Sequence, residues 1–545
     1  MRGLINDFAR GLIGAAISGL SVALTALHWM RIGTVRRGHR RMLRRYDLTP
    51  GTPIQGWSAS VERSLQQRAG SAARLALTSG AAACPKRVPY TERRLRSVRL
   101  AYVDMFVRGC RALRIRRRSL YVFSAFRPDD SVTALLVSER RAPWYLSTLQ
   151  APYRVQSHPA MRALASAYGP TALRLWILTI ANPGVLYSTN PSTLSTFCDD
   201  LTDDWLRHAK LVRDYCERPG AFAREVHAIA GRLESRGSAD RLGLVAASRS
   251  ALPLHSFAPG VEAYICWTGG YVKPFLARLA RHLPSERYRL IPMFSMATET
   301  IETVPHFDGA AVSFLPLARG VCYEFIEEGA EDRPGNLLTA DRLQAGKAYA
   351  MVVSDRYGLR RYQTGDLFLC RGFCAGLPDL EFLRRRDMEY SFTGEKLTSD
   401  QLVLAFERLR AACSEIRPED FLACVPSHPA GEPVPHYKVV LVLRVDDDRV
   451  VRDADIARLC DRLLGEINGE YQVKRDSGRL GAVRVVRMGP AELADRAGGP
   501  RGSWESQFKF LPLSRERWES GRGAPDKTTP ALEPSNAISR TSTRA

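Results

Sequence analysis

The stretch 349–366 reads YAMVVSDRYGLRRYQTGD, and it is the most informative part of the chain for fold and function. Apolar runs on both sides of Tyr357-Gly358 predict two strands, over 347–356 and 359–370, joined by a hairpin turn. Asp366 follows a glycine at a strand junction, where a carboxylate can accept hydrogen bonds from the vicinal hydroxyls of a ribose. The alternative is a turn carboxylate that accepts hydrogen bonds from neighbouring N–H groups, and this segment alone favours the alternative.

The chain around this stretch has 545 residues, which is too long for a single core, so two or more domains are expected. Strand patterns such as 132–138 alternate with helical patterns, and consecutive strand patterns follow. This order predicts a large α/β domain with a β subdomain over 71–386 and a small α+β domain over 387–515. Residues 1–70 are expected to form a helical region, and the Ser/Thr/Pro-rich end, 516–545, is expected to be disordered.

The composition is that of a globular protein, with 45% hydrophobic and 25% charged residues. The formal net charge is +22, but only nine of the 79 basic residues are lysines, and the arginines are spread over the whole chain. A nucleic-acid-binding surface would concentrate the charge and interleave aromatic residues, so no dedicated nucleic-acid partner is expected. The eleven cysteines show no metal-ligand spacing, so free thiols in a reducing cytoplasm are expected rather than a zinc site.

Residues 11–30 raise the question of a membrane, because this segment contains no charged residue. Its length could span a bilayer. Gly, Ala, Ser and Thr are abundant in it, however, and His28 lies inside it, so its apolarity is weak. A buried or surface-lying helix is therefore expected rather than a span, and contact of 11–30 with a membrane is open but not expected. The protein is expected to be cytoplasmic and monomeric.

A second candidate segment holds Thr78, Ser79 and Gly80 after a short apolar run, then small residues, then Lys86. Small residues let backbone N–H groups approach a phosphate closely, and a lysine adds a point charge. Lysine is scarce in this chain and, unlike the planar arginine fork, carries a compact ammonium group, so a retained lysine is informative. A surface turn is the alternative, and this segment alone favours it.

A third candidate segment, Phe294-Ser-Met-Ala-Thr298-Glu299-Thr300, directly follows an apolar strand pattern. Hydroxyls and a carboxylate at the carboxyl end of a strand lie where α/β folds bind ligands, and a glutamate can hold Mg²⁺. A helix N-cap formed by Thr298 or Thr300 explains the segment equally well.

Together and in this order, the three segments resemble the signature motifs of the adenylate-forming superfamily, which includes firefly luciferase and acyl-CoA synthetases. The closer similarity is to the Gretchen Hagen auxin-responsive family of acyl-acid amido synthetases, in particular its bacterial type. Four further stretches are similar to that family: Cys266–Gly270 (CWTGG), Gly320–Ile326 (GVCYEFI), 349–366 as quoted above, and Phe392–Thr398 (FTGEKLT). The resemblance runs from about residue 71 to residue 512, and it is most specific over 347–400.

The resemblance implies the adenylate-forming fold, with a large N-terminal domain and a small mobile C-terminal domain. It also implies an ATP-dependent ligase. ATP and a carboxylic acid would form an acyl-adenylate and pyrophosphate with Mg²⁺, and an amine, usually of an amino acid, would then form an amide and release AMP. For the first step, the negative charge on the phosphates must be neutralised and the carboxylate must be positioned at the α-phosphorus. The expected partners are therefore a small carboxylic acid and an amine.

The resemblance also assigns roles at the phosphates. The residues expected to lie along the phosphates are Thr78, Ser79, Gly80 and Lys86. Thr298 and Glu299 would lie near the α-phosphate, with Glu299 as the Mg²⁺ ligand. Lys509, in a Q-x-K pattern near the end of the resemblance, would reach the phosphates when the small domain swings. Lys86, Glu299 and Lys509 are thus the expected catalytic residues, although a solvated side chain is the alternative for Lys509.

At the nucleoside, the resemblance places Asp366 on the ribose hydroxyls, with Tyr362 nearby. Tyr323 and Phe325 would flank the nucleotide or acyl pocket. These two residues alternate along a predicted strand, so a core position for one of them is the alternative.

The chain departs from the family pattern at several positions. Ala81 lacks the usual hydroxyl, which removes a hydrogen bond of about 1.5–3 kcal/mol to a charged group. Cys84 replaces a glycine where a loop must fold tightly. Gln363 replaces an arginine, Met296 replaces a glycine, and Leu513 stands where an arginine is usual. ATP use is therefore expected to be slow, altered or lost.

The sequence leaves three other functions open. A thiol, of coenzyme A or a carrier protein, would make the product a thioester. A non-catalytic relative would bind a nucleotide or a partner without turnover, as the altered loop suggests. A basic nucleic-acid binder is the weakest option, because the positive charge is dispersed.

Overall fold

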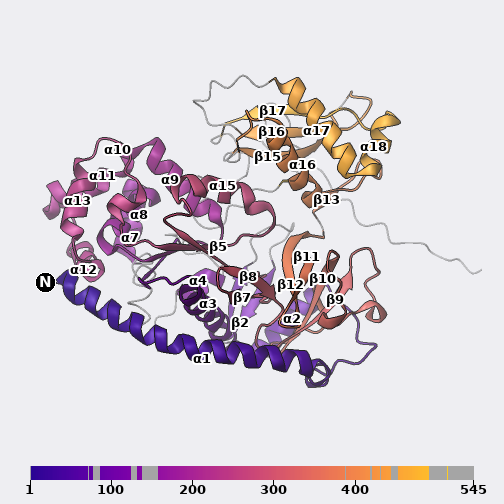
Figure 1. The fold of residues 1–545 in the computed structure, drawn as a ribbon, viewed down its shortest axis with the longest axis horizontal. Coiled ribbons are helices and arrows are strands. Elements are labelled where there is room, and N and C mark those ends of the chain that lie inside the picture. Colours follow the sequence, from indigo (N-terminus) through magenta and orange to yellow (C-terminus); the bar gives the residue numbers. More distant parts are fainter. Residues whose placement is uncertain are drawn as a thin grey trace, which may run out of the picture.

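The computed structural model describes residues 2–71, 73–77, 86–123, 132–137, 158–386, 388–417, 420–429, 431–442, 452–489 and 512–513. A larger body contains the elements up to β12, and a smaller body with α16–α18 and β15–β17 lies beside it (Figure 1). The mixed helix and sheet architecture expected from the order of sequence patterns is confirmed.

One long helix, α1 (Arg2–Arg45), runs along the outer side of the larger body (Figure 1). Its buried residues include Ser21, His28 and Ile32. Helix α2 (Ala59–Ala69) follows, and Ser58 caps it by accepting a hydrogen bond from the N–H of Val61. In the described part of the chain, every helix is too short or too polar to cross a bilayer.

A parallel sheet forms the centre of the larger body. Its strands follow the order β3 (Leu120–Val122), β4 (Val185–Tyr187), β5 (Ala263–Cys266) and β6 (Arg289–Pro292). Alternate residues of these strands enter two different cores: Tyr187 and Ile265 lie in one, and Leu186 and Tyr264 lie in the other. The sheet is therefore covered on both faces, as a parallel sheet requires.

Helices cover both faces of this sheet. Helix α3 (Glu92–Ala112) shares the first core with α1, α2 and the short helix α4. The helices that contribute to the second core are α7 (Pro159–Tyr168), α8 (Pro170–Ala181), α9 (Pro191–Asp203), α10 (Trp205–His208), α11 (Lys210–Glu217), α12 (Arg224–Leu233), α13 (Ser238–Ala247), α14 (Leu254–Phe257) and α15 (Lys273–His282).

The strand expected over 132–138 is wrong, because Val132–Val137 forms the helix α4. The run VTALLV is apolar at most positions, and over so few residues the periodicity of a buried strand cannot be told from that of a buried helix. Val132 and Leu135 are both buried in the first core, which the three-residue spacing of a helix allows.

An antiparallel sheet forms the β subdomain, in the order β12 (Leu377–Arg385), β11 (Tyr362–Cys374), β10 (Ala348–Asp355) and β9 (Val321–Glu327). The predicted hairpin is confirmed: β10 and β11 pair on either side of Tyr357-Gly358. Gly358 has a φ of +122°, and a Cβ there would come within 2.9 Å of Leu65, so the turn needs glycine. Two further antiparallel pairs are β1 (Arg74–Leu77) with β2 (Arg87–Tyr90), and β7 (Val304–Asp308) with β8 (Ala311–Leu315).

The smaller body has its own core around Leu402, Phe406 and Leu441. Its elements are β13 (Glu389–Tyr390), β14 (Leu397–Thr398), α16 (Ser399–Ala412), β15 (Phe421–Ser427), β16 (His436–Val442), α17 (Asp453–Ile467), α18 (Gly469–Asp476) and β17 (Arg484–Met488). Phe421 packs on Phe275 of the larger body, with ring centroids 4.6 Å apart. The separate cores are compatible with the expected boundary near residue 387, which stays a prediction.

Candidate active site

Three of the expected site residues meet at one point. The Lys86 ammonium lies 2.6 Å from Oε1 of Glu299 and donates a hydrogen bond to the Tyr362 hydroxyl at 2.9 Å. The Tyr362 hydroxyl donates to the same Oε1 at 2.7 Å. Burial, and then the charge of Glu299, raise the pKa of Tyr362, so its hydroxyl keeps the proton that it donates. We call Lys86, Glu299 and Tyr362 the site triad.

Aromatic rings enclose the ammonium of the triad. Lys86 lies directly before β2, and its Nζ is 5.6 Å from the ring centroid of Tyr362 and 5.7 Å from that of Trp57. Trp57 precedes α2 and meets Tyr362 edge-on, with centroids 6.1 Å apart. Cation–π attraction therefore adds to the ion pair in holding the lysine. The sequence contained no signal for Trp57, which is an isolated aromatic residue in a polar segment.

Main-chain contacts hold the Thr298-Glu299 segment in place. The Tyr90 hydroxyl donates to the carbonyl of Thr298 at 2.7 Å, and the buried Arg94 of α3 donates to the carbonyl of Glu299. Burial raises the pKa of Tyr90 to about 12, so this donor stays protonated at neutral pH. The segment is thus fixed by its backbone, which leaves the Glu299 side chain to face Lys86. The alternative of a helix N-cap is excluded, because no helix begins at Thr298 or Thr300.

Asp366 lies on β11 next to a second carboxyl group, that of Glu302. Glu302 is 1% exposed and accepts a hydrogen bond from the Ser295 hydroxyl at 2.7 Å. Burial, and then the charge of Asp366 hydrogen-bonded to it, raise the pKa of Glu302 well above its ordinary value. Two carboxylates in such contact need a proton between them, so Glu302 stays protonated and Asp366 carries the charge. Arg385 contributes a guanidinium 3.8 Å from Asp366.

Tyr323 and Phe325 lie in the core of the β subdomain. The Tyr323 hydroxyl donates to the carbonyl of Ile301 at 2.8 Å and accepts from the N–H of Ala318 at 3.1 Å. Phe325 is fully buried. The structure thus gives the Tyr323 hydroxyl two main-chain partners, and the expected role of these residues in flanking the nucleotide or acyl pocket stays a prediction.

The residue before Tyr362, Arg361, forms a buried ion pair with Glu324. Arg361 has a φ of +41°, and its guanidinium meets the Glu324 carboxylate through two contacts of 3.0 and 3.1 Å. It also donates to the carbonyls of Thr49, Pro50 and Thr52, which join the N-terminal region to β9. Arg361 directly precedes Tyr362 and so fixes where β11 starts. The motif contained this arginine, but its partner could be found only in three dimensions.

Several expected site residues lie outside the described residues. These are Thr78, Ser79, Gly80 and Lys509. The neighbouring Pro512 accepts a hydrogen bond from the N–H of Cys424 at 2.7 Å, and Leu513 bridges to the same strand, β15. The roles expected for the phosphate loop and for Lys509 stay predictions.

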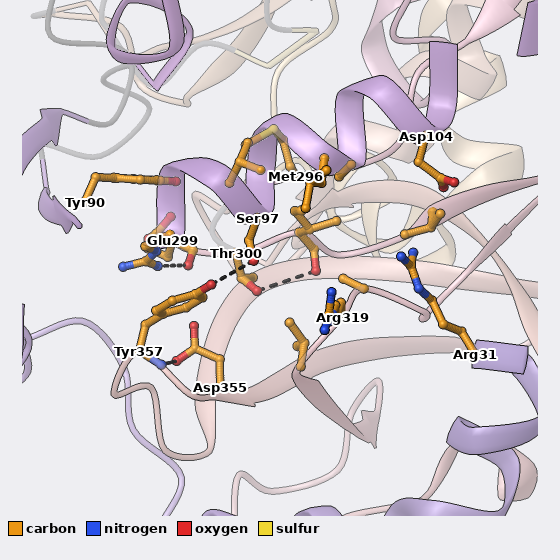
Figure 2. Close-up of a pocket in the computed structure, with 18 residues that line it drawn as sticks. Arg31, Tyr90, Ser97, Asp104, Met296, Glu299, Thr300, Arg319, Asp355 and Tyr357 are labelled. Carbon is orange, nitrogen blue, oxygen red and sulfur yellow. Dashed lines mark hydrogen bonds between the residues drawn. The ribbon is translucent and has the colours of Figure 1, made fainter. Parts of the chain in front are cut away.

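A cavity of about 60 Å³ lies on the other side of Glu299, which is room for a few water molecules. Figure 2 shows Tyr90 and Glu299 at one end of the group of lining residues and Arg31 at the other, with Met296, Thr300 and Arg319 between them. The Tyr357 hydroxyl donates to the Ser97 hydroxyl at 2.8 Å at its edge (Figure 2). Met296, which replaces the usual glycine, thus places its side chain in this cavity.

Sequence comparison finds that this chain is similar to amido synthetases over part of its length. The profile of the GH3 family central domain matches residues 314–385. The probable indole-3-acetic acid-amido synthetase GH3.9 of Oryza sativa subsp. japonica is 27% identical over 216 residues, which are 38% of this chain and 48% of that protein. The jasmonoyl–L-amino acid synthetase JAR4 of Nicotiana attenuata is 27% identical over 258 residues, 44% of this chain and 42% of that protein. The matches thus span about half or less of these relatives.

Comparison of structures extends over most of the chain. The acyl acid amido synthetase AtGH3.15 in complex with 2,4-DB has a TM-score of 0.68 at 16% identity, covering 91% of this chain and 94% of that one. A 2-hydroxyisobutyryl-CoA ligase in the postadenylation state has a TM-score of 0.51 at 12% identity, covering 90% and 89%. The expected fold is confirmed. Residues 314–385 match the GH3 family central domain, the chain is similar in sequence to GH3 amido synthetases, and its fold is that of the acyl acid amido synthetase AtGH3.15.

Proposed function

We propose that this protein is an ATP-dependent acyl-acid amido synthetase, which activates a carboxylic acid as its acyl-adenylate and transfers the acyl group to an amine. The observation that carries the proposal is the site triad. Lys86 lies more than 200 residues before both Glu299 and Tyr362 in the chain, yet the contacting atoms of the three side chains lie within 2.9 Å of one another. If these segments were only structural turns, nothing would require their side chains to meet.

The chemistry of the triad suits an adenylation site. Without a nucleotide, the Lys86 charge is compensated by Glu299, and Tyr362 bridges the two. The phosphates of ATP would compete for the ammonium, which is a flexible point charge and can turn toward them. The acid's carboxylate would attack the α-phosphorus and pyrophosphate would leave; the amine would then attack the acyl carbon and AMP would leave. Asp366, kept charged beside protonated Glu302, would accept the ribose hydroxyls.

Magnesium fits the donor set at Glu299. Mg²⁺ takes oxygen ligands and is usually held by one or two carboxylates together with substrate phosphates. The side chain of Glu299 is only 4% exposed, and the hydroxyl of Thr298 lies next to it in sequence. When bound, the ion would neutralise the phosphate charge. The described residues hold no group of three or more metal-ligating side chains, so Glu299 would share the ion with ATP.

The proposal includes the substrates, the oligomeric state and the location of the protein. The partners would be a small carboxylic acid and an amino acid, with the protein acting as a monomer in the cytoplasm. The curated relatives are named for indole-3-acetic acid and jasmonoyl conjugation, and these acids are the first to test here.

The test begins with binding of ATP and Mg²⁺ by calorimetry, to wild type and to Asp366→Ala and Tyr362→Phe. We expect the Asp366 variant to lose at least about tenfold in affinity, because a charged hydrogen-bond acceptor is removed. ATP–pyrophosphate exchange across a panel of acids then measures adenylation, and mass spectrometry identifies the product with amino acids or with coenzyme A. Tyr357→Phe, which removes a hydroxyl outside the triad, is the control for Tyr362→Phe.

Each outcome of these experiments either supports the proposed function or contradicts it. Exchange with an acid followed by an amide product supports the proposal. A thioester product would instead make the protein an acyl-thioester ligase. ATP binding without exchange over broad acid and amine panels would contradict an enzymatic role and indicate a non-catalytic relative. Failure of a folded wild type to bind ATP would overturn the proposal at its first step.

A further inference from the structure

Between residues 15 and 30 the exposed side of helix α1 is apolar, whereas the polar Ser21 and His28 lie on its buried side, next to the partly buried Leu24. Between residues 15 and 30, the residues described as exposed are Ala15, Gly19, Leu20, Val22, Ala23, Ala26, Leu27, Trp29 and Met30. At 100° per residue they fall on about one half of the helix circumference. Ser21 and His28 point inward and are 3% and 2% exposed. A helix adapted to water would show the reverse pattern.

The larger body holds α1 in this orientation. His28 shares a hydrogen bond of 2.9 Å with His306 of β7, and the two rings stack with centroids 5.2 Å apart. Arg111 of α3 donates to the Ser21 hydroxyl at 3.4 Å, and the Tyr46 hydroxyl just after the helix donates to the carbonyl of Gly320 at 2.6 Å. These polar contacts fix the rotation of α1, so the apolar half is turned away from the protein.

The exposed apolar side chains on this half are large. Val22 and Met30 are each 59% exposed, and Trp29 is 52% exposed. Leu20 and Leu27 are 43% and 44% exposed. Scattered exposed apolar residues need no explanation, but a contiguous set of this kind marks an interaction surface. Figure 1 shows α1 along the outside of the larger body.

The same half of α1 becomes basic toward its C-terminal end. Arg41, Arg44 and Arg45 are exposed and fall within the same half circumference as Val22 and Met30. The apolar part spans roughly 25 Å along the axis, and the arginines follow it. We call the exposed residues of 15–30 together with these three arginines the outer face of α1.

We propose that the outer face of α1 docks the protein onto an anionic membrane surface, with the helix lying in the plane of the headgroups. The apolar half would enter the boundary between headgroups and acyl chains, where tryptophan is favoured, and the arginines would meet anionic headgroups. The helix lies on the bilayer and does not cross it, in agreement with its weak apolarity. This inference is independent of the amido synthetase activity.

Charge complementarity favours a membrane over a second copy of the chain. A second copy would have to offer carboxylates to the arginines, and the sequence of α1 contains a single acidic residue, Asp7. Nucleic acid would satisfy the arginines but would leave the apolar half in water. Only an anionic bilayer matches both parts of the face.

The test is co-sedimentation of the full chain with vesicles of phosphatidylcholine alone and of phosphatidylcholine mixed with phosphatidylglycerol. We expect binding to the mixed vesicles, at least about tenfold tighter than to the neutral ones, and weaker in high salt. Arg41→Gln/Arg44→Gln/Arg45→Gln should reduce the affinity for mixed vesicles about tenfold or more. Val22→Glu/Trp29→Glu should abolish binding.

The matched control is Leu206→Glu/Val473→Glu, which makes the same change at exposed apolar residues of α10 and α18 and should bind like wild type. Circular dichroism melts establish that every variant is folded. Absence of vesicle binding by the folded wild type would overturn the proposal. So would a wild-type dimer in light scattering that Val22→Glu/Trp29→Glu converts to a monomer, since the face would then belong to a second copy.

Discussion

Glu302 shows how one residue outside the recognised motifs sets the charge of a site. Its carboxyl group is buried beside Asp366, and both burial and that neighbouring charge raise its pKa. The proton held by Glu302 leaves Asp366 as the charged member of the pair. In the ribose-binding role proposed for Asp366, the site would therefore offer one acceptor carboxylate and not two repelling ones.

The Glu302 pair predicts a specific pH dependence of stability. Above about pH 4.3 an unfolded glutamate loses its proton, whereas folded Glu302 keeps it, so the unfolding free energy falls as the pH rises toward the folded pKa. Glu302→Gln removes this loss and keeps an acceptor for Ser295. We expect the difference in unfolding free energy between the variant and wild type to be at least about 1 kcal/mol larger at pH 8 than at pH 4, in favour of the variant. Urea denaturation at the two pH values measures it.

Glu286→Gln, in the turn between α15 and β6, is the control, because that side chain is exposed to solvent and lies outside any helix. It should change stability equally at both pH values. If Glu302→Gln behaved in the same way, the carboxyl pair would not share a proton in the folded protein.

At the scale of elements, the parallel sheet depends on a close approach between β3 and β4. Gly184, directly before β4, accepts a hydrogen bond from the N–H of Glu262 at 2.8 Å and donates to the carbonyl of Ser119 at 3.0 Å. A Cβ on Gly184 would lie 2.0 Å from the carbonyl oxygen of Arg117. The neighbour is backbone and cannot move aside, so the start of this strand requires glycine.

Gly184→Ala should therefore destabilise the protein by about 3 kcal/mol, through overpacking against a rigid neighbour. The matched control is Gly243→Ala, within helix α13, where a Cβ would meet nothing within 4 Å. That change should stabilise the protein by about 0.5–1 kcal/mol, because alanine favours the helix. Thermal melts of both variants measure the difference. Equal effects of the two substitutions would show that β3 and β4 tolerate a wider spacing.

At the scale of the whole molecule, a small apolar cluster joins the two bodies. Phe275 of α15 is 2% exposed and packs with Phe421, Ala423 and Val425 of β15. The Arg278 guanidinium lies 4.6 Å from the Phe421 ring centroid, and Arg384 of β12 pairs with Asp400 of α16. Among the described residues, this cluster is smaller than the separate cores on either side, and the expected motion of the smaller body relative to the larger one stays a prediction.

Phe275→Ala should loosen this junction without unfolding either core. The cluster would lose a buried aromatic ring, a change that costs about 3–5 kcal/mol in a rigid core. We expect faster hydrogen exchange in both α15 and β15, and a larger radius of gyration by small-angle scattering. Phe373→Ala, at a residue 48% exposed, is the control and should change neither. Unchanged exchange at β15 would mean that the two bodies are held together elsewhere.

The sequence by itself determined the features that depend on local geometry. The hairpin at Tyr357-Gly358 and the order of the three signature segments could be read from turn chemistry and strand patterns, because these depend on neighbours in the chain. The three segments, in their order along the chain, resemble the signature motifs of the adenylate-forming superfamily, and that resemblance singled out Lys86, Glu299 and Tyr362.

Only the tertiary structure decided which distant groups meet. Trp57 beside Lys86, Glu302 beside Asp366 and Glu324 beside Arg361 are contacts between segments far apart in the chain, and no local pattern specifies such partners. The orientation of α1 is of the same kind. Its sequence shows both apolar and polar residues, and the stack of His28 on His306 selects which side of the helix faces the solvent.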